Sequence, residues 1–125
     1  MAYRILVVDD EPEVRHLLSL YLESAGYEIV AVDNGKEALR SLEDGAFNLV
    51  ILDIMLPEMT GWEVCRQIKN CSHTSDLPVI FLTARSQPLD RVIGLEVVHA
   101  DAYLTKPFER DQLCSTINCC LNMAS

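Results

Sequence analysis

The chain has 125 residues, of which 50% are hydrophobic, and it carries a formal net charge of −9. This length fits one domain over residues 1–125, and the hydrophobic content argues for a packed globule instead of a disordered tail. A surface this acidic repels phosphate backbones, so direct nucleic-acid binding is not expected. The sequence lacks an apolar run of the roughly 20 residues that span a membrane, and acids interrupt its N-terminal apolar run too early for a signal peptide. A cytoplasmic location is therefore expected.

Apolar runs and helix-type spacing alternate along the chain. The five expected strands are Ile5–Val8, Glu28–Val32, Leu49–Leu52, Val79–Leu82 and Ala102–Leu104. The five expected helices run from Pro12 to a glycine stop at Gly26, and over Lys36–Glu43, Trp62–Asn70, Pro88–Val98 and Arg110–Leu121. Strands that are apolar at every position are typical of a parallel sheet that is buried on both faces. Five strand–helix repeats predict an α/β sandwich with a parallel sheet and right-handed crossovers.

The chain has five cysteines, an odd number that shows neither a C-x-x-C motif nor a paired zinc spacing. In a reducing cytosol such cysteines remain free thiols. We expect most of them to lie on half-buried helix faces, where they behave as small hydrophobic side chains.

Polar residues follow four of the expected strands. Asp9 and Asp10 follow the first, Asp53 the third, Thr83 the fourth and Lys106 the fifth. Each alone has an ordinary structural explanation, because Asp and Thr cap helices and most lysines are solvated. In a parallel sheet, however, these strand ends share one edge, where open α/β sheets bind their ligands. Three acids, a hydroxyl and a lysine at that edge therefore predict a functional site.

The chemistry of such a cluster is coherent. Three neighbouring carboxylates repel one another unless a cation is near, and oxygen ligands with room for water suit Mg²⁺. A bound metal neutralises charge during phosphoryl transfer. Lys106 is able to pair with one phosphoryl oxygen, and the Thr83 hydroxyl to donate to another. With these partners, Asp53 is the candidate nucleophile that becomes an acyl phosphate.

Over almost its whole length the sequence resembles the receiver domain of two-component response regulators. The matching segments are Ile-Leu-Val-Val-Asp9-Asp10-Glu, Leu-Val-Ile-Leu-Asp53-Ile-Met-Leu-Pro57, Gly61, Leu-Thr83-Ala84 and Tyr103-Leu-Thr-Lys106-Pro107-Phe. Each segment is modest alone, but together, in this order and spacing, they are highly specific. The resemblance implies a flavodoxin-like (βα)5 fold with strand order 2-1-3-4-5, for which a receiver is one of the known examples.

The resemblance also implies that Asp53 accepts a phosphoryl group from a sensor histidine kinase or a phosphotransfer protein. It implies that Asp10, Asp53 and the backbone carbonyl of Met55 bind Mg²⁺ directly, and that Asp9 binds it through water. The chain would then be a signalling domain that assists its own phosphorylation and dephosphorylation, and not a turnover enzyme.

The resemblance also implies roles in phosphoryl binding, switching and output. Thr83, the Ala84 amide and Lys106 would contact the phosphoryl group. Tyr103 matches the switch aromatic, whose inward rotation is coupled to movement of the Thr83 hydroxyl. The face formed by the fourth helix, fifth strand and fifth helix would then control an output domain or protein. Residues 112–125 have no charged side chain, so we expect the isolated domain to be largely monomeric.

One departure from the family pattern is His99, which stands where relatives usually have a glycine before Ala-Asp. If that position ends a helix with a positive φ, His99 must adopt this conformation at some cost. A metal-binding role for His99 is weak, because no second histidine has ligand spacing to it.

Three other functions fit the sequence less well. A carboxylate-nucleophile phosphatase requires a second acid at the position of Met55. A nucleotide-binding module requires a glycine- or hydroxyl-rich loop where Asp9, Asp10 and Glu11 stand. A receiver-like interaction module that works without phosphorylation remains the alternative.

Overall fold

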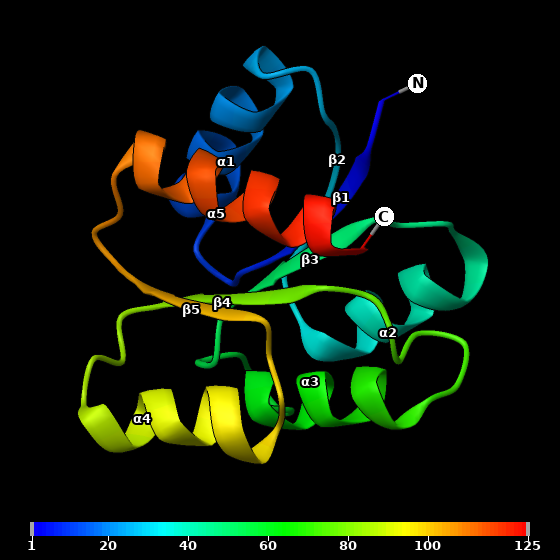
Figure 1. The fold of residues 1–125 in the computed structure, drawn as a ribbon, viewed down its shortest axis with the longest axis vertical. Coiled ribbons are helices and arrows are strands. Elements are labelled where there is room, and N and C mark those ends of the chain that lie inside the picture. Colours follow the sequence, from blue (N-terminus) through cyan, green and yellow to red (C-terminus); the bar gives the residue numbers. More distant parts are fainter. Residues whose placement is uncertain (1, 125) are drawn as a thin grey trace.

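The computed structural model describes residues 2–124 and contains a parallel sheet of five strands in the order β2-β1-β3-β4-β5 (Figure 1). The strands are β1 Arg4–Val8, β2 Glu28–Val32, β3 Leu49–Leu52, β4 Val79–Thr83 and β5 Ala102–Thr105. The central strands β1, β3 and β4 are buried along nearly their whole length, which explains why they are apolar at almost every position. The predicted fold class and strand order are confirmed.

Helices cover both faces of the sheet, with α1 and α5 on one side and α2, α3 and α4 on the other (Figure 1). Their bounds are α1 Pro12–Ser24, α2 Gly35–Asp44, α3 Gly61–Asn70, α4 Pro88–Val92 and α5 Arg110–Ala124. The sheet separates two hydrophobic cores, and alternate residues of each strand point into one or the other. In β1, for example, Ile5 and Val7 pack in the cluster that contains Leu18 of α1, whereas Leu6 and Val8 pack in the cluster of α2 and α3.

Side-chain caps explain why two helices begin one residue earlier than predicted. The side chain of Asn34 accepts a hydrogen bond from the Glu37 amide, so α2 begins at Gly35. The side chain of Thr60 does the same for the Glu63 amide, so α3 begins at Gly61. Both are ordinary N-caps, in which a side-chain oxygen satisfies an amide of the first turn.

The predicted single helix over Pro88–Val98 is wrong in its second half. The α-helix ends at Val92 and continues as a π-helix, η1, over Ile93–Val97. This wider turn holds Gly94 against the rings of Tyr103 and Phe81, where an added Cβ would lie 2.9 Å from Tyr103 Cδ2. His99 then ends the segment with φ of 63°, as expected from its place in the sequence. The last helix also extends beyond the predicted Leu121, because no glycine or proline follows to end it.

Gly61 brings the start of α3 into backbone contact with the end of β3. Its amide donates a 2.8 Å hydrogen bond to the carbonyl of Ile54. A Cβ at this position would overlap the Asp53 carbonyl oxygen and lie 2.7 Å from the Ile54 Cα. Only glycine allows this approach, so Gly61 fixes the main chain beside Asp53.

Candidate functional site

The carboxyl ends of β1 and β3 place two aspartates side by side in the interior. The Asp9 amide donates to the Val32 carbonyl at 3.2 Å, and the Asp53 amide donates to the Val8 carbonyl at 3.0 Å. These bonds extend the ladders of parallel strands by one residue. Asp9 is consequently only 2% exposed and Asp53 only 3% exposed. Such burial is costly for carboxylates that lack partners.

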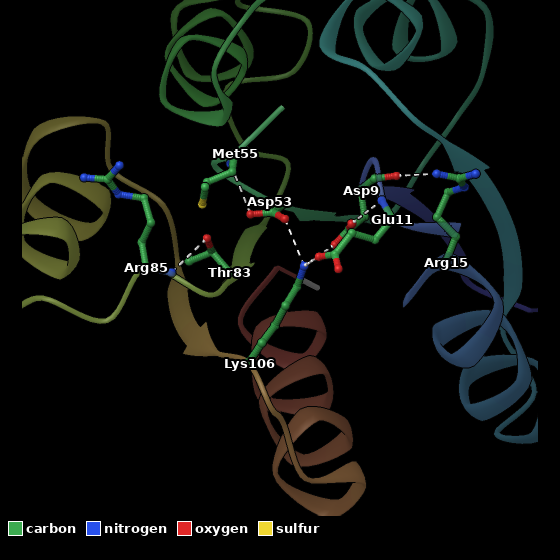
Figure 2. A network of polar contacts seen from close by, with 8 residues as sticks. All are labelled: Asp9, Glu11, Arg15, Asp53, Met55, Thr83, Arg85 and Lys106. Carbon is green, nitrogen blue, oxygen red and sulfur yellow. Dashed lines mark hydrogen bonds and ion pairs between the residues drawn. The ribbon is translucent and has the colours of Figure 1, made fainter. Parts of the chain in front are cut away.

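Lys106 supplies the partner for both aspartates. Its ammonium Nζ lies 2.8 Å from Asp9 Oδ2, 2.9 Å from Asp53 Oδ2 and 2.8 Å from Glu11 Oε1 (Figure 2). The lysine is held in place by its own amide, which donates to the Thr83 carbonyl at 2.8 Å. An ammonium group has three hydrogens to donate, so these three carboxylates satisfy it completely.

Burial and this ion-pair network shift two pKa values. Burial raises the pKa of Asp9 above its ordinary value, although the hydrogen bond from Lys106 opposes the shift. For Lys106, burial alone would lower the pKa, but the hydrogen bonds to Asp9, Glu11 and Asp53 together raise it. Lys106 therefore remains a full positive charge at neutral pH.

Thr83 and Met55 occupy the other side of Asp53. Thr83 is fully buried at the end of β4, and its hydroxyl oxygen accepts a 3.3 Å hydrogen bond from the Arg85 amide (Figure 2). The second oxygen of Asp53, Oδ1, accepts a 3.1 Å hydrogen bond from the Met55 amide. Ala84, between Thr83 and Arg85, is exposed. The residues predicted from the four strand ends therefore meet at one edge of the sheet.

Tyr103 lies inside the molecule. It is 3% exposed, its ring centroid is 6.0 Å from that of Phe81, and its hydroxyl donates a 2.7 Å hydrogen bond to the Arg85 carbonyl. Burial, followed by the nearby charge of Asp90, raises the pKa of Tyr103 to about 12. The Tyr103 side chain therefore lies inside the protein, and its role as a switch stays a prediction.

The acidic cluster has the composition of a Mg²⁺ site. Asp9, Asp10, Glu11 and Asp53 each offer a carboxylate oxygen, and these oxygens lie within 4.8 Å of one another. All are hard oxygen donors, and Asp10 and Glu11 are exposed, which leaves space for the waters that Mg²⁺ retains. The donor set therefore fits the predicted metal.

Glu11 was not among the predicted site residues, although it contacts Lys106. The available signal was its position directly after Asp9 and Asp10, at the end of the same strand. Its contact with Lys106 depends on how far two long side chains reach, which spacing does not reveal.

An open cavity of about 430 Å³ adjoins the cluster. Its lining residues include Asp10, Met55, Thr60, Trp62 and Arg85. A small ligand in this cavity would contact the exposed Asp10, whereas Asp9 and Asp53 are buried and do not line it.

Two further predictions concern the cysteines and membrane spans. The five cysteines are free thiols, as predicted, but the expected half-buried position is found only for Cys114, because Cys65 and Cys120 are buried and Cys71 and Cys119 are exposed. Within residues 2–124, no helix has both the length and the apolar character needed to cross a membrane.

Comparisons with known proteins agree with this geometry. A family model described as "Response regulator receiver domain" matches residues 5–118. The transcriptional regulatory protein YrkP of Bacillus subtilis is 46% identical over 113 residues, which cover 90% of this chain and 47% of YrkP. The chain spans about half the length of the curated relatives it matches.

Two solved structures show the same fold. A response regulator from Chloroflexus aurantiacus superposes with a TM-score of 0.93 at 32% identity, covering 98% of this chain and 99% of that one. The response regulator TrrA of Thermotoga maritima, solved in complex with Mg²⁺ and a beryllium fluoride, is 40% identical with a TM-score of 0.84, covering 94% and 98%.

Proposed function

The chain belongs to the family of response regulator receiver domains, and on that premise we propose that it is a phosphorylation-switched signalling domain whose phosphoacceptor is Asp53. The observation that carries the proposal is the buried Asp53 carboxylate, 2.9 Å from the Lys106 ammonium inside a cluster of acids. One receiver domain over residues 1–125 accounts for all five strand–helix repeats.

In the proposed reaction, an Asp53 carboxylate oxygen attacks the phosphorus atom of a phosphohistidine. A P–O bond forms, the P–N bond breaks, and its electron pair leaves with the imidazole. Lys106, the Thr83 hydroxyl and the Ala84 amide are the donors that would receive the phosphoryl oxygens. Hydrolysis reverses the state, because water attacks phosphorus and returns Asp53 to a carboxylate. The chain thus assists its own modification without turning over a substrate.

The groups that would hold Mg²⁺ are Asp10, Asp53 and the Met55 carbonyl directly, with Asp9 acting through water. When bound, the metal neutralises charge that accumulates on the transferred group. The exposure of the two neighbouring aspartates supports this division. Asp9 is 2% exposed and pairs with Lys106, whereas Asp10 is exposed.

The proposed output runs through Thr83 and the loop that follows it. Movement of Thr83 toward a phosphoryl group would pull on the Arg85 amide, which its hydroxyl contacts. Arg85 in turn touches Tyr103 through its carbonyl and Asp90 through its guanidinium. The face formed by α4, β5 and α5 would thereby change and control an output domain or protein.

The proposed partners follow from the same reaction. The phosphodonor would be a sensor histidine kinase or a phosphotransfer protein in the cytoplasm. The relatives named as transcriptional regulators are about twice as long as this chain, so control of a further domain in the full protein is part of the proposal.

The test is Mg²⁺-dependent labelling by acetyl phosphate, followed by intact mass spectrometry. Wild type should gain one phosphate and Asp53→Asn none, because an amide is a far poorer nucleophile than a carboxylate. Labelling of both proteins would move the acceptor to another residue. An unlabelled wild type would favour the alternative, an interaction module that works without phosphorylation.

A further inference from the structure

Lys106 is bound by three carboxylates that differ sharply in exposure. The side chains of Asp9 and Asp53 are 3% and 4% exposed, whereas that of Glu11 is 53% exposed. All three oxygens lie 2.8–2.9 Å from Nζ. The three hydrogens of the ammonium are therefore already used, and any further acceptor must displace one of them.

The cost of displacement differs among the three. Freeing Asp9 or Asp53 would leave a buried carboxylate without its positive partner, which is strongly unfavourable. Freeing Glu11 returns a half-exposed carboxylate to water, and exposed ion pairs are weak. Glu11 is also free to move, because it stands before the first turn of α1 and its side chain caps no helix amide. Glu11 is thus the partner that Lys106 loses most easily.

We propose that Glu11 is a positioning residue, which holds the Lys106 ammonium between Asp9 and Asp53 and gives up its place to the incoming phosphoryl group. The inference rests on the proposed function, since it assumes that a phosphoryl oxygen reaches Lys106. Glu11 and the phosphodonor compete for the same ammonium hydrogen. Neutralising Glu11 should therefore strengthen binding of the phosphodonor.

The experiment measures phosphorylation by acetyl phosphate with saturating Mg²⁺ in three proteins: wild type, Glu11→Gln and Glu13→Gln. Glu13 is the matched control, because it is exposed in the first turn of α1 and loses the same charge. Glu11→Gln should lower the half-saturating acetyl phosphate concentration about two- to fivefold. Glu13→Gln should change this concentration far less.

A double-mutant cycle shows whether Glu11 acts through Lys106. In a Lys106→Ala background, or Lys106→Met if the alanine variant does not fold, Glu11→Gln should have no more effect than Glu13→Gln. A second measurement, by NMR, requires neither Mg²⁺ nor phosphorylation. The NMR signals of the Lys106 side chain should shift in Glu11→Gln and stay in place in Glu13→Gln.

Three results would overturn the inference. The first is that the two glutamine variants behave alike, and the second is that the Glu11→Gln effect persists without Lys106. The third is that Glu11→Gln loses Mg²⁺ affinity more than tenfold and is phosphorylated more slowly. The last result would make Glu11 a metal ligand instead. A wild type that is never labelled would remove the proposed function, and with it this inference.

Discussion

The Tyr103 hydroxyl donates a 2.7 Å hydrogen bond to the main-chain carbonyl of Arg85. The Arg85 side chain is itself paired with the buried Asp90, with Nη2 2.8 Å from Oδ1. The loop between β4 and α4 is thus tied to β5 on one side and to α4 on the other. Because this loop begins directly after Thr83, in the proposed switch these two contacts would carry movement at the site to the surface.

Tyr103→Phe should destabilise the protein by about 0.5–1.5 kcal/mol, because the Arg85 carbonyl loses a buried donor. Amide NMR signals of Ala84 and Arg85 should shift, and urea unfolding measures the stability. Tyr27→Phe is a matched control, since the Tyr27 hydroxyl donates to Asn118 Oδ1 at 2.8 Å, far from this loop. Unchanged signals at residues 84 and 85 would show that the hydroxyl does not hold the loop.

Mg²⁺ should bind weakly to the unphosphorylated protein, because the ion keeps several waters. Asp10→Ala should weaken binding more than Asp9→Ala, since the exposed Asp10 would bind the ion directly, whereas the buried Asp9 would reach it through water. Trp62 and Asp10 line the same cavity, so a titration followed by tryptophan fluorescence reports the difference. Equal losses in the two variants would contradict a water-mediated role for Asp9.

His99→Gly should stabilise the protein by about 0.5–1 kcal/mol, because glycine adopts a φ of 63° without the strain of a Cβ. Urea unfolding measures the change. His73→Gly is the control: within residues 2–124, Glu58 and His99 are the non-glycine residues with positive φ, so His73 has no such strain to lose. Stabilisation at both positions would point to a cause other than backbone conformation.

The thiols should react with iodoacetamide in the order of their exposure. Burial raises the pKa of the Cys65 thiol to about 12, so its reactive thiolate forms only as the pH rises far above neutral. Near neutral pH, peptide mapping should find Cys71 and Cys119 modified and Cys65 unmodified. All five should react in urea. Rapid modification of Cys65 in the native protein would reveal opening of the α3 side of the core.

The isolated domain should remain largely monomeric at micromolar concentration, with or without beryllofluoride and Mg²⁺. Arg91 and Asp101 are two charges that could still pair between copies on the α4–β5–α5 face. Within the chain, however, Arg91 donates to the Tyr103 carbonyl and Asp101 accepts from Lys69. Sedimentation velocity decides: an activator-dependent dimer would mean that apolar side chains on this face, such as Leu89 and Val97, drive association.

The residues at strand ends were predictable because a parallel sheet brings every carboxyl end to one edge. That rule alone gathers Asp9, Asp53, Thr83 and Lys106, whatever the intervening helices contain. The contacts of Glu11 were not predictable, because they depend on the conformations of flexible side chains. The π-helix was also not predictable, because the spacing of apolar residues between Pro88 and Val98 does not distinguish an α-helical turn from a slightly wider one.

The contact at Gly61 gives the acceptor a rigid side and a movable side. On the rigid side, α3 touches the main chain of Asp53 and Ile54 with no room for a methyl group, and it is anchored in the core by Val64 and Ile68. The main chain on this side of Asp53 therefore has little room to move. The loop after β4 is held by fewer contacts, among them the hydrogen bond from Tyr103 and the ion pair with Asp90, so we expect movement to occur there. Gly61→Ala should therefore disturb the acceptor and the fold together, whereas changes in that loop should alter signalling while the protein stays folded.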